Sequence, residues 1–195
     1  MTEPRHALPA DRDDMHRTFT EAFITDPMWV WLMPDPDRDG YARQASVERF
    51  MNIDIADYHP MGHTYILPGQ AAALWSPPGF RPDLTEFLTA FGEEADPVLA
   101  TAAGEHFARM MSHTPDEPHF YLHLIGARDD ARGRGLGSIL LDQMHATCDA
   151  EGIPAYLEAS TRRSAALYAR HGYEELDIIE FTPGVVMTPM LRQPR

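Results

Sequence analysis

Residues 121–141 read YLHLIGARDDARGRGLGSILL, and the rest of the chain can be interpreted outward from them. Aromatic and apolar residues around His123 predict a buried strand, and the later amphipathic pattern is typical of a helix. Three alternating glycines lie between the two, so backbone N–H groups at the helix start can closely approach a phosphate, whose charge the helix dipole favours. Two arginines add forked donors at the same place. The sequence therefore predicts a pyrophosphate-binding loop made by Arg132, Gly133, Arg134, Gly135 and Gly137.

The spacing of these glycines excludes other nucleotide-binding motifs. A dinucleotide fold has G-x-G-x-x-G after an early strand-helix-strand unit, whereas this chain has G-x-G-x-G and no such unit ahead of it. A Walker loop needs a lysine, but all 16 Lys and Arg residues are arginines. The absence of lysine also excludes Schiff-base chemistry.

Three segments carry a resemblance to a known family. Arg132–Gly137 matches the [R/Q]-x-x-G-x-[G/A] signature of the GNAT superfamily of acyl-CoA-dependent N-acyltransferases. Tyr156–Ser160 is typical of the next strand, and Ala166–Tyr173 resembles the family's L-Y-x-x-x-G-[F/Y] segment. Ala72–Pro78 is similar to the puromycin N-acetyltransferase branch. The resemblance is best over residues 120–191 and implies acetyl-CoA as the cofactor.

The order of predicted elements agrees with this family. We expect a single acyltransferase domain over residues 1–195, with the acceptor side and a helical lid in residues 1–118 and the coenzyme-binding core in residues 119–195. The fold class is α/β of the α+β type: a mixed, mostly antiparallel sheet of about six or seven strands with helices on both faces. The GNAT resemblance implies that the central strands are splayed.

Local patterns define the other elements. Helices are predicted to end near Ile24 and Tyr58, and residues 82–113 are predicted to be helical with breaks near Gly92 and Pro97. Met28–Met33 is an apolar segment between two helices. Strands are predicted over His63–Leu67, Gln70–Trp75, Tyr173–Phe181 and Val185–Met190, the last two as a hairpin.

Composition limits the partners. The net charge of −14 makes the chain a poor binder of nucleic acid or anionic membranes. Cys148 is a single cysteine, which excludes an intramolecular disulfide and fits a reducing compartment. Met1–Met15 lacks a signal-peptide pattern, so we expect a cytoplasmic protein that is a monomer or homodimer.

The resemblance implies the roles of the cofactor-binding residues. The end of the central strand would line the pantetheine arm, with the Ile125 amide facing the thioester carbonyl, and the glycine loop would hold the pyrophosphate. Tyr168 would be the general acid, and Ser164 stands where the family often has asparagine. The implied cofactor-binding set is Leu124, Ile125, Gly126, Ala127, Arg132, Gly133, Arg134, Gly135, Leu136, Gly137, Ser138, Ser164 and Tyr168.

The general base stays open between two side chains and water. His123 lies nine positions before Arg132, where several branches of the superfamily place a base, and an imidazole titrates near neutrality. Glu158, at the end of the adjacent predicted strand, is the alternative. No metal site is predicted, because His119 and His123 would lie about 13 Å apart along a strand.

The acceptor is expected to be a primary amine of a small molecule, which attacks the thioester directly, without a covalent enzyme intermediate. Trp29, Trp31 and Trp75 are the candidates for binding it. Three alternatives remain: a non-catalytic acyl-CoA sensor or scaffold, an acetyltransferase for protein or peptide amines, and a phosphate-binding module for another nucleotide.

Overall fold

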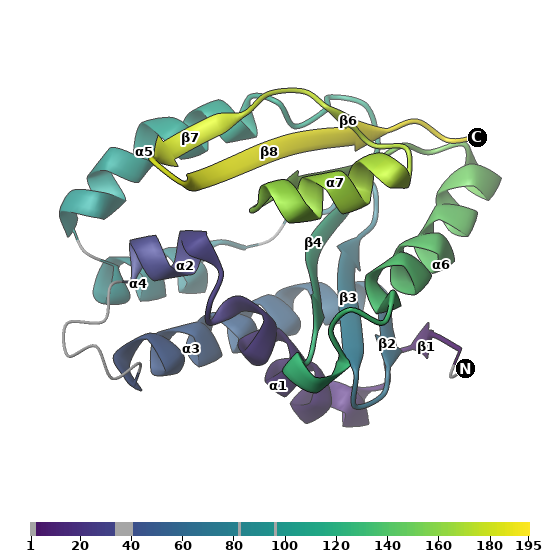
Figure 1. The fold of residues 1–195 in the computed structure, drawn as a ribbon, viewed down its shortest axis with the longest axis horizontal. Coiled ribbons are helices and arrows are strands. Elements are labelled where there is room, and N and C mark those ends of the chain that lie inside the picture. Colours follow the sequence, from purple (N-terminus) through teal and green to yellow (C-terminus); the bar gives the residue numbers. More distant parts are fainter. Residues whose placement is uncertain (1–2, 34–40, 82, 96) are drawn as a thin grey trace.

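The molecule is built on an eight-stranded sheet in the order β1-β2-β3-β4-β5-β8-β6, with β7 paired to β8 (Figure 1). The computed structural model describes residues 3–33, 41–81, 83–95 and 97–195. β4 and β5 pair in parallel, and the other neighbours pair antiparallel. The strands are β1 (Arg5–His6), β2 (His63–Leu67), β3 (Ala71–Ser76), β4 (Phe120–Ala127), β5 (Ala155–Ala159), β6 (Glu174–Glu175), β7 (Ile179–Thr182) and β8 (Val185–Arg192).

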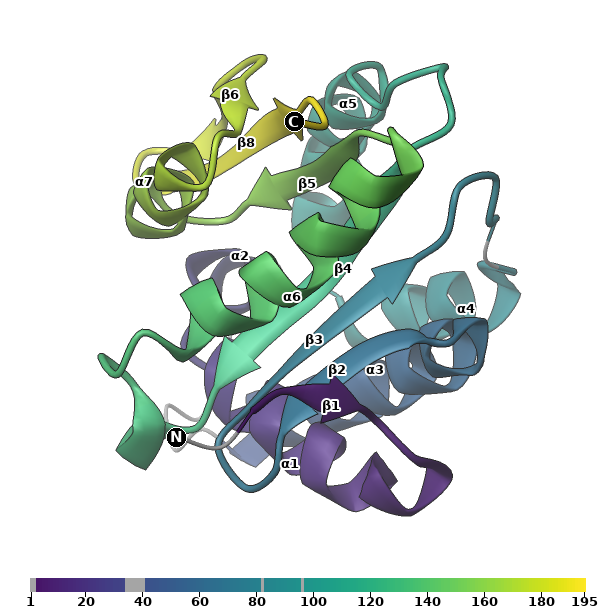
Figure 2. The same ribbon diagram turned by 90° about the vertical axis from the view of Figure 1, so that its right-hand side faces the viewer.

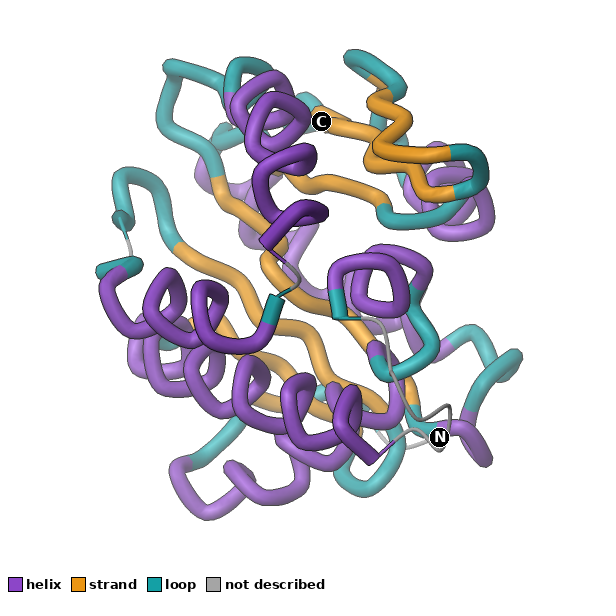
Figure 3. The backbone as a smooth tube through the Cα atoms, turned by 90° about the vertical axis from the view of Figure 1, so that its left-hand side faces the viewer, coloured by secondary structure: helices purple, strands orange, loops and turns teal. Residues whose placement is uncertain are grey.

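Helices cover both faces of this sheet. One face of β2, β3 and β4 is crossed by α6 (Figure 2), and helices lie in front of the strands when the molecule is seen from the other side (Figure 3). The helices are α1 (Arg12–Phe23), α2 (Pro27–Leu32), α3 (Tyr41–Tyr58), α4 (Thr85–Glu94), α5 (Pro97–Met111), α6 (Leu136–Glu151) and α7 (Arg162–Arg170). The predicted fold class is confirmed.

The two faces have separate cores. Along β3, Ala71, Ala73 and Trp75 pack toward α6, whereas Ala72 and Leu74 pack toward α1 and α3. This alternation follows from the two-residue period of a strand. Because both faces are covered, β3 is buried along its whole length, which explains its nearly continuous apolar sequence.

Two expectations for the helical regions differ from the structure. Met28–Met33 largely forms α2, because Asp26 accepts a hydrogen bond from the Met28 N–H (2.9 Å) and Pro27 fits the first helical position. Gly92 lies inside α4, which ends before Ala95, where the backbone is extended (φ −77°, ψ 145°); the second predicted break, near Pro97, is confirmed by the start of α5 there. In the described part of the chain, no helix has the length and apolarity needed to cross a bilayer.

The segment Tyr173–Phe181, predicted as one strand, forms β6 and β7 with a break between them. The break coincides with Asp177, whose carboxylate accepts hydrogen bonds from Arg109 (2.8 Å) and from the Ile178 N–H (2.8 Å). These bonds to a helix and to the next residue replace strand pairing locally. The division accounts for the eighth strand.

Candidate active site

The parallel strands β4 and β5 pair over only three residues. Phe120–Leu122 faces Ala155–Leu157, and within the described chain no pairing continues beyond them. β4 nevertheless extends to Ala127. The two strands are therefore splayed, as predicted, and a cavity of about 740 Å³ lies at the opening. We call it the central cavity.

A β-bulge at His123 changes the direction of β4. β3 pairs Trp75 with Leu122 and Leu74 with Leu124, so His123 is one extra residue in β4. A bulge reverses the alternation of the strand beyond it. The bulge therefore decides which amide groups of β4 face β3 and which face the opening.

Two hydrogen bonds fix these directions. On one side of the bulge the Phe120 N–H donates to Pro154 O (2.9 Å), toward β5; on the other side the Arg128 N–H donates to Gln70 O (2.8 Å), toward β3. Because N–H direction alternates along an antiparallel strand, the odd-numbered residues after the bulge point away from β3. The Ile125 N–H thus faces the opening between β4 and β5.

The glycine loop ends at the N-terminus of α6 and lines the same cavity. Gly133 and Gly135 have φ of 77°, a left-handed conformation that favours glycine, and Gly135 is the N-cap of α6. The first-turn N–H groups of a helix have no intrahelical acceptor, so the loop presents donors and the positive end of the helix dipole. This arrangement suits a diphosphate.

His123 contacts an acidic residue that sequence reasoning missed. Its Nε2 lies 3.0 Å from Oδ1 of Asp54, which is buried in α3, although the two are not aligned for a hydrogen bond. The imidazole also stacks on Tyr58, with ring centroids 4.0 Å apart and an interplanar angle of 5°. Asp54 follows Met51 by one helical turn and precedes Tyr58 by another, so a carboxylate within an apolar stripe was the available signal.

Glu158 reaches the central cavity from β5. Burial raises the pKa of its carboxyl group, and the neighbouring Tyr121 and Tyr156 hydroxyls and the charge of His123 oppose that rise. A raised pKa makes a carboxylate a better proton acceptor near neutrality. Both candidate bases therefore line one cavity.

Tyr168 lies on α7 and is almost fully buried at the cavity wall. Burial raises the pKa of its hydroxyl group, and the negative charge of Asp26 adds to the rise. Asp26 itself accepts a hydrogen bond from Ser160 (2.5 Å), and burial raises the pKa of its carboxyl. Asp26 is thus a second residue near the candidate catalytic groups that sequence reasoning missed.

The structure brings most of the predicted site residues together. The cavity is lined by Trp29, His123, Leu124, Ile125, Gly126, Ala127, Arg132, Gly133, Gly135, Leu136, Gly137, Ser138, Glu158, Ser164 and Tyr168. Three predicted residues lie elsewhere: Arg134 is exposed and donates to Asp130 O (2.6 Å), Trp31 packs against Phe181, and Trp75 is wholly buried on the α6 side of the sheet.

The fold and the cavity define an acetyl-CoA-dependent N-acetyltransferase. The chain belongs to the acetyltransferase (GNAT) family, whose model matches residues 16–173. A curated relative is an uncharacterized N-acetyltransferase of Schizosaccharomyces pombe, 25% identical over 194 residues, covering 91% of this chain and 77% of that protein.

Solved structures agree with this assignment. One, described as histone acetyltransferase HPA2 and related acetyltransferase from Corynebacterium glutamicum, is 26% identical with a TM-score of 0.74, covering 100% of this chain and 98% of the other. Arylalkylamine N-acetyltransferase 2 from Aedes aegypti shares the fold at 12% identity and a TM-score of 0.62, covering 99% of each chain.

Proposed function

We propose that this enzyme transfers an acetyl group from acetyl-CoA to a primary amine of a small molecule by direct attack. The observation that supports this most is the convergence on one cavity of the unpaired β4 edge, the glycine loop, Tyr168 and two candidate bases. When bound, acetyl-CoA supplies a thioester carbonyl for attack and a thiolate leaving group. The following paragraphs derive the part of each residue.

The coenzyme would be held by backbone groups. The N–H groups at the start of α6, between Gly135 and Ser138, suit the diphosphate, and the open edge of β4 offers peptide groups to the pantetheine arm. The Ile125 N–H, which faces the opening, would stabilise the negative charge that develops on the thioester oxygen. Ser164 is tied to Thr161 in the cap of α7, with its hydroxyl donating to Thr161 O (2.8 Å). It would contact the coenzyme only from that fixed position.

Proton transfer would involve both sides of the opening. Tyr168 stays protonated at neutral pH because its raised pKa lies above the reference value of about 10, so it would donate a proton to the departing thiolate. The base would be either His123, positioned by Asp54, or Glu158, whose pKa is raised by burial. That residue would take the proton of the amine, whose nitrogen would form the new bond to the acetyl carbon as the carbon–sulfur bond is broken.

The acceptor side would be formed by residues 1–118, with a helical lid. Trp29 of α2 and Met110 of α5 line the central cavity, and Trp29 packs on Phe50 with ring centroids 5.1 Å apart. These apolar groups, together with the carboxylates of Asp26 and Glu158, suit an amine with an apolar or aromatic part. The Aedes aegypti protein's name, arylalkylamine N-acetyltransferase, supports the same substrate class.

A thiol-release screen tests the proposal. The full chain is incubated with acetyl-CoA and a panel of arylalkylamines, linear diamines and a lysine-containing peptide, and acetyl-CoA, ATP and NAD binding is measured by calorimetry. We expect turnover with a small amine at a higher kcat/KM than with the peptide. Faster peptide acetylation would favour a protein substrate, as the name of the Corynebacterium glutamicum protein suggests for that protein. Acetyl-CoA binding without thiol release would indicate a non-catalytic sensor or scaffold. Tighter binding of ATP or NAD than of acetyl-CoA would indicate a module for another nucleotide.

The pH dependence of kcat/KM separates the two bases. If His123 is the base, His123→Ala removes the acidic limb of the pH profile and Glu158→Gln retains it. If Glu158 is the base, the two variants exchange these results. Retention of the limb in both variants would indicate that water takes the proton, because neither side chain would then be needed.

A further inference from the structure

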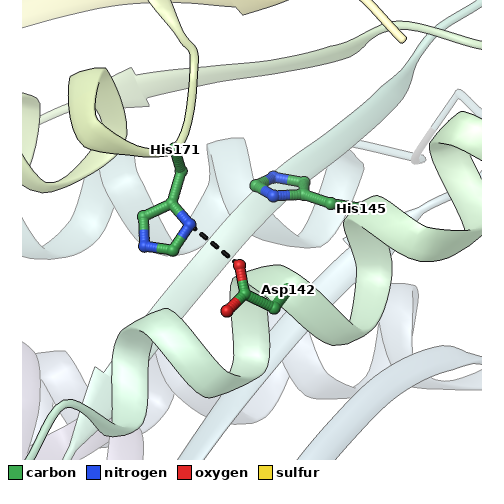
Figure 4. A group of neighbouring side chains, drawn as sticks. All are labelled: Asp142, His145 and His171. Carbon is green, nitrogen blue, oxygen red and sulfur yellow. Dashed lines mark ion pairs between the residues drawn. The ribbon is translucent and has the colours of Figure 1, made fainter. Parts of the chain in front are cut away.

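A second group of chemistry-bearing side chains lies outside the central cavity. Asp142 and His145 are one turn apart on α6, so they share a helix face, and His171 follows the end of α7. One potential ligand atom from each of the three lies within 4.8 Å of the other two. Figure 4 shows the three side chains pointing toward one another, two from α6 and one from the residue that follows α7.

Each imidazole is held through one ring nitrogen by a hydroxyl group. His171 Nε2 lies 3.0 Å from Ser138 Oγ, while its Nδ1 faces Asp142 Oδ1 at 3.0 Å. His145 Nε2 lies 3.0 Å from the Tyr173 hydroxyl oxygen, which leaves Nδ1 for the group. In metal sites the second nitrogen of a ligating histidine is usually engaged in this way, because the bond fixes the tautomer and the ring orientation.

From this arrangement we infer that Asp142, His145 and His171 bind a divalent transition-metal ion of the Zn²⁺ class. Two imidazoles and one carboxylate are three of the four ligands of a tetrahedral zinc site, and water completes such a set. With bonds of about 2.0–2.1 Å, neighbouring ligand atoms in a tetrahedron are about 3.3 Å apart. The Asp142 and His171 atoms lie 3.0 Å apart, so they would separate by a few tenths of an ångström, and the Asp142 side chain is 69% exposed, so it can turn toward His145.

The arginines near the proposed metal site are engaged by other groups of the protein. The same surface hollow, of about 510 Å³, is also lined by Arg170, Arg192 and Arg195. Asp149 accepts two hydrogen bonds from Arg192, both 2.8 Å, and a third from the Arg195 backbone N–H (2.9 Å). Arg170 donates to Ala166 O on its own helix (2.9 Å). The Arg192 charge is therefore largely balanced beside the site.

The ion would join two helices that flank the central cavity. Ser138, the partner of His171, lies in the first turn of α6 and lines that cavity, and α7 carries Tyr168 three residues before His171. A bound ion would thus fix α6 against α7. Sequence reasoning considered only His119 and His123 as a pair, because residues 142, 145 and 171 come together only through packing of the two helices.

Calorimetry with ZnCl₂ tests the inference on the full chain after removal of metals with a chelator. We expect one ion per chain. Asp142→Ala should weaken binding about 100-fold or more, since loss of an outer partner alone costs about 10–100-fold. Asp142 is exposed, so this variant should fold, which circular dichroism checks. His171→Ala should have the same effect as Asp142→Ala.

A matched control is His113→Ala. His113 also pairs with a carboxylate, Asp177, at 2.9 Å, but that carboxylate binds Arg109 as well. His113→Ala should leave zinc binding unchanged. Three results would overturn the inference: no zinc binding by the parent protein, equal binding by Asp142→Ala and the parent, or loss of binding in the control. Binding of inorganic phosphate in the hollow without any affinity for zinc would assign it to anions instead. None of these readouts depends on acetyl transfer.

Discussion

Gly126 of β4 allows α1 to pack directly against the strand that borders the central cavity. A Cβ atom at position 126 would lie 2.5 Å from the Cβ of Ala22, with Phe19 and Phe23 carbons next at 3.6 and 3.8 Å. Carbon atoms normally approach to about 3.5 Å, so Gly126→Ala creates an overlap of about 1 Å. Both atoms are fixed to backbone, which means that α1 itself has to move.

The expected cost of this overlap is about 1–3 kcal/mol of the free energy of unfolding, as for other overpacked cores. Activity should fall as well, because Ala22 and Phe23 line the cavity and Asp26 follows them. A shift of about 1 Å can reduce turnover by about 100-fold. Urea unfolding followed by circular dichroism measures the first effect, and thiol release measures the second.

A double-mutant cycle with Ala22→Gly gives the decisive result. Ala22→Gly alone should cost about 1 kcal/mol through helix propensity, but in the Gly126→Ala background it removes the overlap. We expect a favourable coupling of about 1–2 kcal/mol between the two sites. The matched control is Gly92→Ala, in α4, where no surrounding atom of the described residues lies within 4 Å of an added Cβ and the change should stabilise by about 0.5–1 kcal/mol. Additive effects of the two substitutions would refute the argument.

Three further outcomes are expected. Gly135→Glu should abolish acetyl-CoA binding in calorimetry, because a side chain is strained at φ 77° and its charge repels a diphosphate; unchanged affinity would contradict the proposed loop. Tyr168→Phe should lower kcat about 100-fold or more with little change in coenzyme affinity, and an unchanged kcat would remove Tyr168 as the acid. Asp149→Ala should cost about 3 kcal/mol in urea unfolding, because it leaves the buried Arg192 charge unpaired. The Arg192 hydrogen bond lowers the pKa of Asp149 to about 2. The pair therefore stabilises the fold above about pH 4, and this contribution is lost as the pH falls through 2. The Asp149→Ala variant should not show that loss.

The fold was predictable wherever local patterns coincide with packing. The glycine loop, the hairpin over β2 and β3, and the hairpin over β7 and β8 were predicted because turn residues and apolar periodicity act within a few positions. α2 was not assigned, because six apolar residues fit a buried strand or a helix equally well. The break at Asp177 was missed because it depends on Arg109 and His113, far away in the sequence.

The features of the candidate active site also divide into those that a local motif predicts and those that depend on residues distant in the sequence. Its backbone elements follow from a contiguous motif, whereas the partners of its side chains come from other elements: Asp54 from α3 beside His123, and Asp26 from the start of α2 beside Tyr168. Trp75 was expected to bind substrate, but strand alternation directs it to the α6 side of the sheet. The residue type of Trp75 does not show which face of the sheet its side chain occupies. We therefore do not include Trp75 in the proposed acceptor pocket.

The extra residue at His123 connects two features of the proposed chemistry. If β4 alternated regularly through His123, the Ile125 N–H would turn toward β3 and pair within the sheet; because His123 is an extra residue, the N–H groups of Leu122 and Ile125 both point away from β3. Because of the extra residue, His123 and Leu124 both lie toward the core formed with α1 and α3, where the imidazole contacts Asp54 and Tyr58. The bulge thus directs a candidate base toward a buried carboxylate, while the amides on either side of it keep the alternation of regular pairing with β3. Deletion of His123 would join Leu122 directly to Leu124 in the register that they already have with Trp75 and Leu74, so it should remove the imidazole and leave the Ile125 N–H facing the opening. His123→Ala should likewise remove only the imidazole.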